Sequence, residues 1–288
     1  MRISDQQTLN NALRNLQSNQ ERLSRSSERA TTGLEVAKPS DDPAAYNRAA
    51  DYQTQLTRMD GYDQNISLVR ARLASTDSTT QSMQGVLTRL RELALGALGP
   101  GTDSTLVASE VVSLRAQLTQ LTNRNINGEY LFSGYSGAAP FNANNVFTGD
   151  NQRRAIEVSP LGATTFGLTA KDAFGVDPGQ VVFPGIDSLI TAIRTRDQAG
   201  VNAGIGAIDS YQKTLAQAQT QLGSQMNWLD LAQSSNQSYR MTLNTALSEA
   251  RDADPAQAYS ALAADRTTME ATYAVLSAGR GLSLVKYL

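Results

Sequence analysis

The chain has 288 residues, a formal net charge of −2, 18% charged residues, and neither histidine nor cysteine. Without those two residue types it has no imidazole base, thiolate nucleophile or disulfide and few ligands for zinc or copper, so we expect no enzyme activity, no metal and no cofactor. The charges are dispersed and no apolar run approaches 18 residues, which argues against a nucleic-acid partner and against a membrane span.

Residues 1–40 predict an N-terminal coiled-coil arm. Its apolar stripe repeats every seven residues, with further leucines on the adjoining row: Leu9, Leu16, Leu23 and Ala30, then Leu13 and Leu34. Five buried leucines contribute about 10 kcal/mol, at about 2 kcal/mol each. Ordering about thirty-five residues costs on the order of 1–2 kcal/mol each. The arm therefore needs a partner, and we expect an assembly interface at Leu9, Leu13, Leu16 and Leu23.

A longer heptad pattern follows and predicts the first part of a helical rod, residues 41–128. Stepping by seven through it meets mostly apolar or small residues: Ala45, Tyr52, Met59, Ile66, Leu73, Thr80, Leu87 and Ala94. A repeat held over this many turns keeps one seam of the helix against partner helices. We expect Met59, Ile66, Leu73 and Leu87 in that seam, and Arg72 on the solvent side.

Short polar segments predict where this helix begins and ends. Ser40-Asp41-Asp42-Pro43 supplies capping side chains, acids suited to the positive end of the helix dipole, and a proline suited to the first turn. Gly99-Pro100-Gly101 marks the end. Asp41 and Asp42 could form a carboxylate pair for a metal, but the proline that follows favours helix punctuation.

The character of the chain changes after the next helix. That helix is predicted from Thr102 to a stop at Asn127-Gly128, antiparallel to the long one. Residues 129–199 then carry short β-prone runs separated by Gly, Pro, Asn and Asp, which predicts a small β-rich outer insert with a short helix over 187–195. Tyr130 and Phe132 could bind a ligand, but a role in the core of the insert is favoured.

Residues 200–252 predict the second part of the rod. Their heptad positions are Ile208, Leu215, Leu222, Leu229, Asn236, Leu243 and Ala250. We expect Leu215, Leu222, Leu229 and Leu243 in the seam, with the single tryptophan, Trp228, packed beside it. Gly204-Ile205-Gly206 resembles part of a dinucleotide-binding loop, but no strand precedes it, so we interpret it as a loose helix start.

Asp252-Ala253-Asp254-Pro255 repeats the acid-then-proline punctuation, and residues 253–288 predict a C-terminal coiled-coil arm. Asp252 and Asp254 are again interpreted as punctuation rather than metal ligands. The apolar positions expected in an assembly interface are Leu262, Met269, Leu276, Leu282 and Leu284. The predicted fold class is therefore mainly α, a long antiparallel α-helical rod or coiled-coil bundle with a small β-rich insert domain, whose two arms can meet at one end.

Several segments resemble the flagellin superfamily of bacteria. They are Met1-Arg2-Ile3-Ser4, the arm heptads, residues 38–44, Asn65-Ile66 and residues 123–134. Within that superfamily, the run Gly-Glu-Tyr-Leu-Phe-Ser-Gly at 128–134 and the ending at 283–288 are similar to the hook-associated proteins of the hook–filament junction. The likeness covers roughly residues 1–134 and 205–288. One departure is that Gln221 and Gln225 flank Gly223, where many members are expected to carry arginines for an inter-subunit salt bridge.

The resemblance implies a structural component of the bacterial flagellum that forms the junction between hook and filament and adapts the hook to flagellin. It also implies secretion by flagellar type III export with the help of an export chaperone, and an extracellular place in the flagellum. The implied partners are further copies in a homo-oligomeric ring, a neighbouring hook-associated protein on the hook side and flagellin on the filament side. Two alternatives remain open: flagellin itself, and a secreted coiled-coil effector or adhesin whose β insert binds a receptor or glycan.

Overall fold

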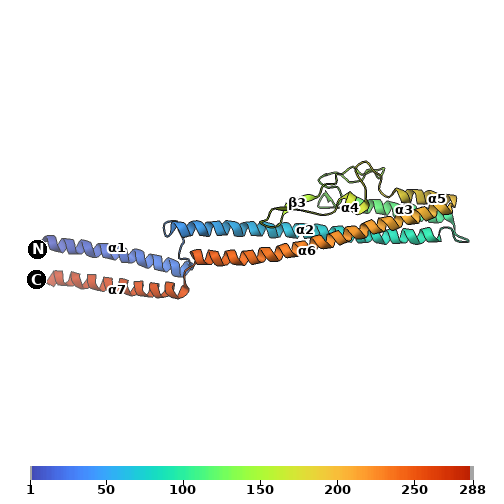
Figure 1. Ribbon diagram of the computed structural model, residues 1–288. Helices are drawn as coiled ribbons and strands as arrows, with labels where there is room; N and C mark the ends of the chain where they lie inside the picture. The colour runs from blue at the N-terminus through green and yellow to red at the C-terminus, as the bar shows by residue number, and fades with distance from the viewer. Residues whose placement is uncertain (1, 286–288) are drawn as a thin grey trace. The chain divides into compact units, whose positions relative to one another are not determined.

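The computed structural model of the protein describes the backbone of residues 2–285 and the side chains of Gln7 and residues 10–277 (Figure 1). The chain divides into two units, residues 1–58 with 239–288, and residues 59–238. Two helices belong partly to each unit, α2 (Pro43–Gly96) and α6 (Gln198–Arg251). Long helices dominate, and the described residues form only two small antiparallel sheets, which confirms the predicted fold class.

In the first unit, α1 (Arg2–Thr32) and α7 (Pro255–Val285) lie side by side and antiparallel (Figure 1). A short backbone pairing joins the segment after α1 to the segment before α7. Ala253 N donates to Gly33 O at 2.8 Å, and Glu35 N donates to Arg251 O at 2.8 Å. The pairing joins the point where the chain leaves α1 to the point where it enters α7. It therefore holds these two helix ends together, so that the apolar stripes of the two arms lie next to each other.

The acidic residues before two of the prolines act as helix caps. Asp42 Oδ1 accepts from the backbone N of Ala44 at 2.9 Å and of Ala45 at 3.0 Å, and Asp254 Oδ1 accepts from Ala256 N at 2.8 Å. Asp41 instead binds the backbone before the helix, because its Oδ2 accepts from Lys38 N at 2.9 Å. This hydrogen bond lowers the pKa of Asp41 below its usual value. Each carboxylate is thus used by nearby backbone amides.

The second unit is built on α2, α3 (Ser104–Thr122) and α6. Asp103 caps α3 by accepting from Thr105 N and Leu106 N. α6 begins at Gln198, earlier than the sequence indicates, because Asp197 Oδ1 accepts from Ala199 N at 3.0 Å. Gly204 therefore lies inside a helix rather than at its start. A Cβ at Gly204 would be 2.8 Å from Leu189 Cβ, so the glycine permits close helix packing.

The predicted end of α3 at Asn127-Gly128 is wrong. The helix ends at Thr122, and Asn123 instead binds the insert: its Nδ2 donates to Phe141 O and its Oδ1 accepts from Phe141 N, both at 3.0 Å. Asn127 (φ 51°) and Gly128 (φ 84°) form the two-residue turn between β1 (Asn125–Ile126) and β2 (Glu129–Tyr130). Asn-Gly suits both a helix end and a type I′ hairpin, and here the hairpin prevails.

The insert adds β3 (Arg154–Glu157) paired with β4 (Ala163–Phe166), and the helices α4 (Ala170–Phe174) and α5 (Pro184–Thr195). Val146 and Val181, which lie in two β-prone runs of the insert, meet through an isolated bridge rather than in a longer strand. Aromatic contacts run from Phe132 through Phe174 and Phe183 to Tyr211 of α6, with ring centroids 4.9 to 5.5 Å apart. The insert therefore shares one hydrophobic core with the long helices.

In the part of the chain that the structure describes, no helix combines the length and the apolar character needed to cross a membrane.

Candidate assembly surfaces and insert anchors

The paired arms bury part of their apolar stripe and leave the rest in solvent. Met269 is buried, 6% exposed, whereas Leu13 is 46% exposed. Leu16, Leu23, Leu262 and Leu276 are half-buried, and Leu9, Leu282 and Leu284 lie outside the described side chains. Tyr259, Tyr273 and Val275 add exposed apolar surface, with Val275 at 72%. Two helices cannot enclose stripes of this kind, so the arm pair has a face suited to further helices.

Two polar contacts between the arms could not be predicted, because the sequence carries no clear signal for them. Arg22 Nη2 lies 2.7 Å from Asp265 Oδ1, and Asn19 Nδ2 donates to Thr272 Oγ1 at 2.9 Å. The only available hint was that Arg22 adjoins Leu23 and that Asp265 lies three residues after Leu262. Polar pairs next to an apolar seam fix the register of the two helices more than they add stability.

Limited proteolysis is expected to trim both arms of the isolated chain and to leave a core of about residues 45–250, because the covered stripe is too small to offset the entropy of ordering the arms. The measurement is mass spectrometry of the fragments over a time course. Two arms as resistant as the core would contradict the expectation.

The eight residues proposed for the rod seam are all buried. Met59, Ile66, Leu73, Leu87, Leu215, Leu222 and Leu229 are in the second unit, and Leu243 is in the first. Arg72, by contrast, is not the solvent-side charge that its helix position suggested. Its Nη1 donates to Glu129 Oε2 and its Nη2 to Tyr130 O, both at 2.8 Å, so the β1–β2 hairpin covers it. Burial, with Arg154 nearby, lowers the pKa of Arg72.

The Gly-Glu-Tyr-Leu-Phe-Ser-Gly run at 128–134 joins α2 to the insert. Glu129 accepts from Arg72 through one oxygen and from Arg154 through the other, the latter at 2.7 Å. Phe132 is fully buried, as expected for a core residue, while Tyr130 is half-buried. Gly134 has φ 70°, and a Cβ there would overlap Asp150. The glycine is therefore required by a close approach.

Two asparagines, one on each long helix, hold the end of β3. Asn65 Nδ2 donates to Glu157 O at 2.7 Å, and Asn236 Nδ2 donates to Val158 O at 2.8 Å. Asn236 is the one amide among the heptad positions of α6, and that break in an apolar pattern was the signal available for it. Because Asn236 is buried, its hydrogen bond to a strand end specifies where β3 lies.

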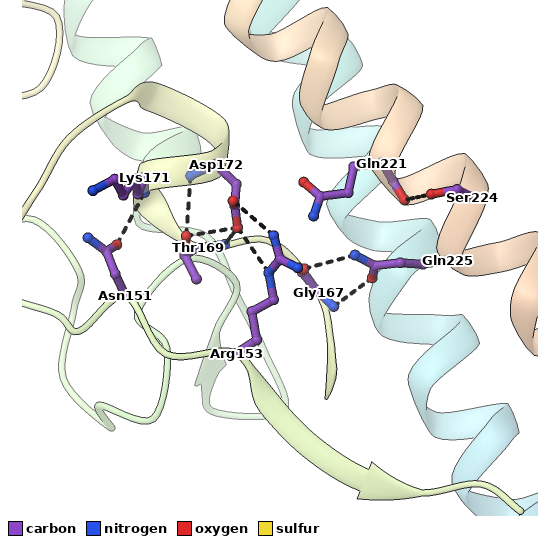
Figure 2. A network of polar contacts seen from close by, with 9 residues as sticks. All are labelled: Asn151, Arg153, Gly167, Thr169, Lys171, Asp172, Gln221, Ser224 and Gln225. Carbon is purple, nitrogen blue, oxygen red and sulfur yellow. Dashed lines mark hydrogen bonds and ion pairs between the residues drawn. The ribbon is translucent and has the colours of Figure 1, made fainter. Parts of the chain in front are cut away.

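A polar network fastens α4 and the strand before it to α6 (Figure 2). Arg153 Nη2 lies 3.0 Å from Asp172 Oδ1, and Asp172 completes a capping box with Thr169. With its amide oriented so that oxygen faces the guanidinium, Gln221 also accepts from Arg153. Gln225 Oε1 accepts from Gly167 N at 2.8 Å and its Nε2 donates to Gly167 O. The two glutamines that flank Gly223 thus bind the insert of their own chain.

Replacing Asp172 by Asn is expected to flatten the acid side of the stability–pH profile. Burial opposes ionisation of Asp172, yet hydrogen bonds from Arg153 and Thr169 outweigh it and set the folded pKa below the usual 3.8. A lowered carboxyl pKa gives stability that is present above the unfolded pKa and is lost as the pH falls through the folded pKa. The partly solvated pair contributes about 1 kcal/mol or less.

The measurement is urea unfolding from about pH 7 to about pH 3. Fluorescence of Trp228 is a suitable signal, because this residue is only 37% exposed and its ring centroid lies 5.4 Å from that of Phe166. The matched control is Asp177→Asn, which removes an exposed ion pair with Lys171. Identical profiles for the Asp172 variant and the unchanged chain would contradict the assignment.

The sequence matches known proteins at both ends. Residues 3–137 match the bacterial flagellin N-terminal helical region, and residues 205–288 match the bacterial flagellin C-terminal helical region. Flagellar hook-associated protein 3 of Escherichia coli K12 is 24% identical over 316 residues, covering 99% of this chain and 98% of that protein. Flagellin of Bacillus subtilis is 23% identical over 292 residues, covering 96% of this chain and 95% of that protein.

The fold also matches a solved structure. The flagellar junction protein FlgL from Legionella pneumophila has a TM-score of 0.58 at 15% identity, covering 71% of this chain and 100% of that one. This likeness shows a shared fold. The two matched helical regions together span well over half of the sequence and include both arms and most of the rod. The chain belongs to the bacterial flagellin family.

Proposed function

We propose that the protein is a structural component of the bacterial flagellum that forms the junction between hook and filament and adapts the hook to flagellin. The observation that carries the proposal is the alignment to flagellar hook-associated protein 3, which extends over 99% of this chain and 98% of that protein and so includes both arms and the insert. The role is mechanical and needs no catalytic residue, metal or cofactor.

The arm pair supplies the assembly surface in this proposal. Its members are Leu9, Leu13, Leu16, Leu23, Leu262, Met269, Leu276, Leu282 and Leu284. The exposure of Leu13 on α1 and of Val275 on α7, whose Met269 is buried, supports a helical surface completed by other chains. The partners proposed are further copies in a ring, a hook-associated protein on the hook side and flagellin on the filament side. Before export through the flagellar type III apparatus, a chaperone covers the same stripe.

A deletion strain tests the role. Cells lacking the protein are expected to carry hooks without filaments and to release monomeric flagellin into the medium, because the filament has no base to grow on. Electron microscopy of hooks and immunoblotting of the medium measure both effects, and the full chain expressed in trans is the control. Normal filaments in the deletion strain would contradict the proposal.

Flagellin is the second candidate, because the Bacillus subtilis flagellin aligns over 96% of this chain. The same deletion separates the two roles. If the protein is the filament subunit, its deletion removes both the filament and the flagellin in the medium. Loss of a junction protein removes the filament but leaves flagellin abundant in the medium.

A further inference from the structure

The buried face of α2 changes character between Leu73 and Met83. The seam is apolar on either side of this stretch, but the residues buried within it are all threonines: Thr76, Thr79 and Thr80, each 1% exposed or less. We call these three residues the threonine layer. Alanine is the only apolar residue among positions 74–82. This part of α2 therefore contributes little apolar surface to the core.

The hydroxyls of the threonine layer are used within α2. Each donates to a carbonyl three or four residues earlier in the same helix: Thr76 to Arg72 O at 2.9 Å, Thr79 to Ser75 O at 2.7 Å, and Thr80 to Asp77 O at 2.8 Å. Such bonds slightly destabilise a helix and often bend it. A polar residue in a heptad seam fixes the register when it bonds to a partner helix, whereas these bonds join α2 to itself.

The facing part of α6 is also poor in apolar side chains. Two contacts between α2 and α6 bracket the threonine layer: Arg70 Nη2 with Asp230 Oδ1 at 2.6 Å, and Gln84 Nε2 with Gln212 O at 3.0 Å. The layer therefore lies opposite the middle of residues 213–229. Within residues 216–225, Leu222 is the only apolar residue larger than alanine. Gly223 follows it, and a glycine inside a helix lowers the stability of that helix.

The third helix of the unit ends at the same level. Arg89 contacts Glu110 of α3, and Arg72 contacts Glu129 of the β1–β2 hairpin, both at 2.8 Å. The chain between these two contacts runs antiparallel to α2, and α3 ends within it at Thr122. The threonine layer thus lies where α3 gives way to the hairpin. Sparse apolar packing of this kind marks the segments of a protein that open locally at low cost.

The insert joins both long helices at this level through a chain of contacts that we call the insert strap. Its links, in order from α2 to α6, are Arg72, Glu129, Arg154, Phe166, Gly167 and Gln225. Glu129 accepts from Arg72 and from Arg154 of β3, and Arg154 is the ladder partner of Phe166 of β4. Gln225 Oε1 accepts from Gly167 N at 2.8 Å, and its Nε2 donates to Gly167 O at 3.3 Å (Figure 2).

We propose that the threonine layer is a hinge of the rod, at which α2 and α6 open locally, and that the insert strap holds this hinge closed. The strap ties the two helices together where the packing between them is weakest. A rod with a hinge fits neighbours of different curvature, and this use rests on the junction role. The hinge itself belongs to the free chain, so its test needs no flagellum.

Hydrogen–deuterium exchange of the purified full chain, read by mass spectrometry and corrected for intrinsic rates, measures local opening. In the unchanged chain, the amides of residues 75–82 are expected to exchange about tenfold faster than those of residues 66–73 and 83–90 of the same helix. Thr79→Val combined with Thr80→Val is expected to remove this difference. The double variant replaces two buried hydroxyls by methyl groups and keeps the β-branched shape.

The matched control for the double variant is Thr220→Val. Thr220 is exposed on α6, and its Oγ1 makes the same kind of bond, to Ala216 O at 3.0 Å. The control changes a hydroxyl without changing the core, so exchange at residues 75–82 is expected to stay fast. Gly223→Ala gives a second stiffened chain, because a Cβ there meets nothing within 4 Å. We expect it to slow exchange at residues 217–224.

The strap is tested by Gln225→Ala, which removes both hydrogen bonds to Gly167. Exchange at residues 75–82 is expected to become faster, although the substitution is on the other helix, and Thr79→Val with Thr80→Val is expected to reverse the change. The control is Gln217→Ala, at an exposed glutamine of α6. Faster exchange confined to α6 in the Gln225 variant would overturn the strap.

The hinge is overturned if residues 75–82 of the unchanged chain exchange as slowly as the segments on either side, a comparison that depends on no variant. Equal slowing by Thr220→Val and by the double variant would overturn it as well. These results are independent of the filament phenotype of the deletion strain. Failure of the hinge is therefore distinguishable from failure of the junction role.

Discussion

Removal of residues 256–288 is expected to abolish filament attachment and chaperone binding while the second unit stays folded. This deletion takes away nearly all of α7, and with it Met269 and the partners of Arg22 and Asn19 on α1. The stripe of α1 then has no cover within the chain. The second unit loses nothing, since its residues are 59–238. Circular dichroism, chaperone pull-down and motility measure the three effects.

A point variant tests whether the effect of the deletion comes from loss of the contact between the arms. Met269→Asp places a charge at a position that is 6% exposed, whereas Thr267→Asp places the same charge at an exposed position of the same helix. We expect loss of motility for the first and near-normal motility for the second, because only the first puts an unpaired charge into the arm contact. Normal filaments on cells with the truncated chain would rule out the arm as an assembly surface and favour the secreted-effector alternative.

Leu73→Asp is expected to lower the melting temperature of the protein by about 10 °C. Leu73 has no exposed surface and lies in the core shared by the long helices and the insert. Burying an uncompensated carboxylate there costs roughly 4 kcal/mol, and a domain of this size loses about 2–4 °C per kcal/mol. Thermal unfolding followed by circular dichroism measures the shift.

The control for this substitution follows from the structure. Arg72 is unsuitable, because it binds Glu129 and Tyr130, so its replacement would also loosen the β1–β2 hairpin. Ala74→Asp adds the same charge at the next residue of the helix, where the side chain is exposed, and is expected to change the melting temperature by only a degree or two. Similar shifts for Leu73→Asp and Ala74→Asp would mean that the heptad frame is misassigned.

The long helices and the starts of α2 and α7 were determined by the sequence itself, for a local reason. A helix buries residues at a fixed period, so the seven-residue spacing from Met59 to Leu87 indicates both the helix and its buried face without knowledge of the partner. The caps at Asp42 and Asp254 are equally local, since each side chain reaches amides two or three residues ahead. The same spacing could not show which part of each arm stays exposed, because that depends on how many helices pack against it.

Only the tertiary structure decided how the insert is held, because its anchors join residues far apart in the chain. Asn65 and Asn236 meet the end of β3, and Arg153 meets Gln221, through hydrogen bonds that no local pattern encodes. Asn127-Gly128 shows the limit most clearly: its positive φ angles suit a helix end as well as a hairpin turn. The choice was made by Asn123, whose side chain binds the backbone of Phe141, and the helix ends six residues before Gly128, at Thr122.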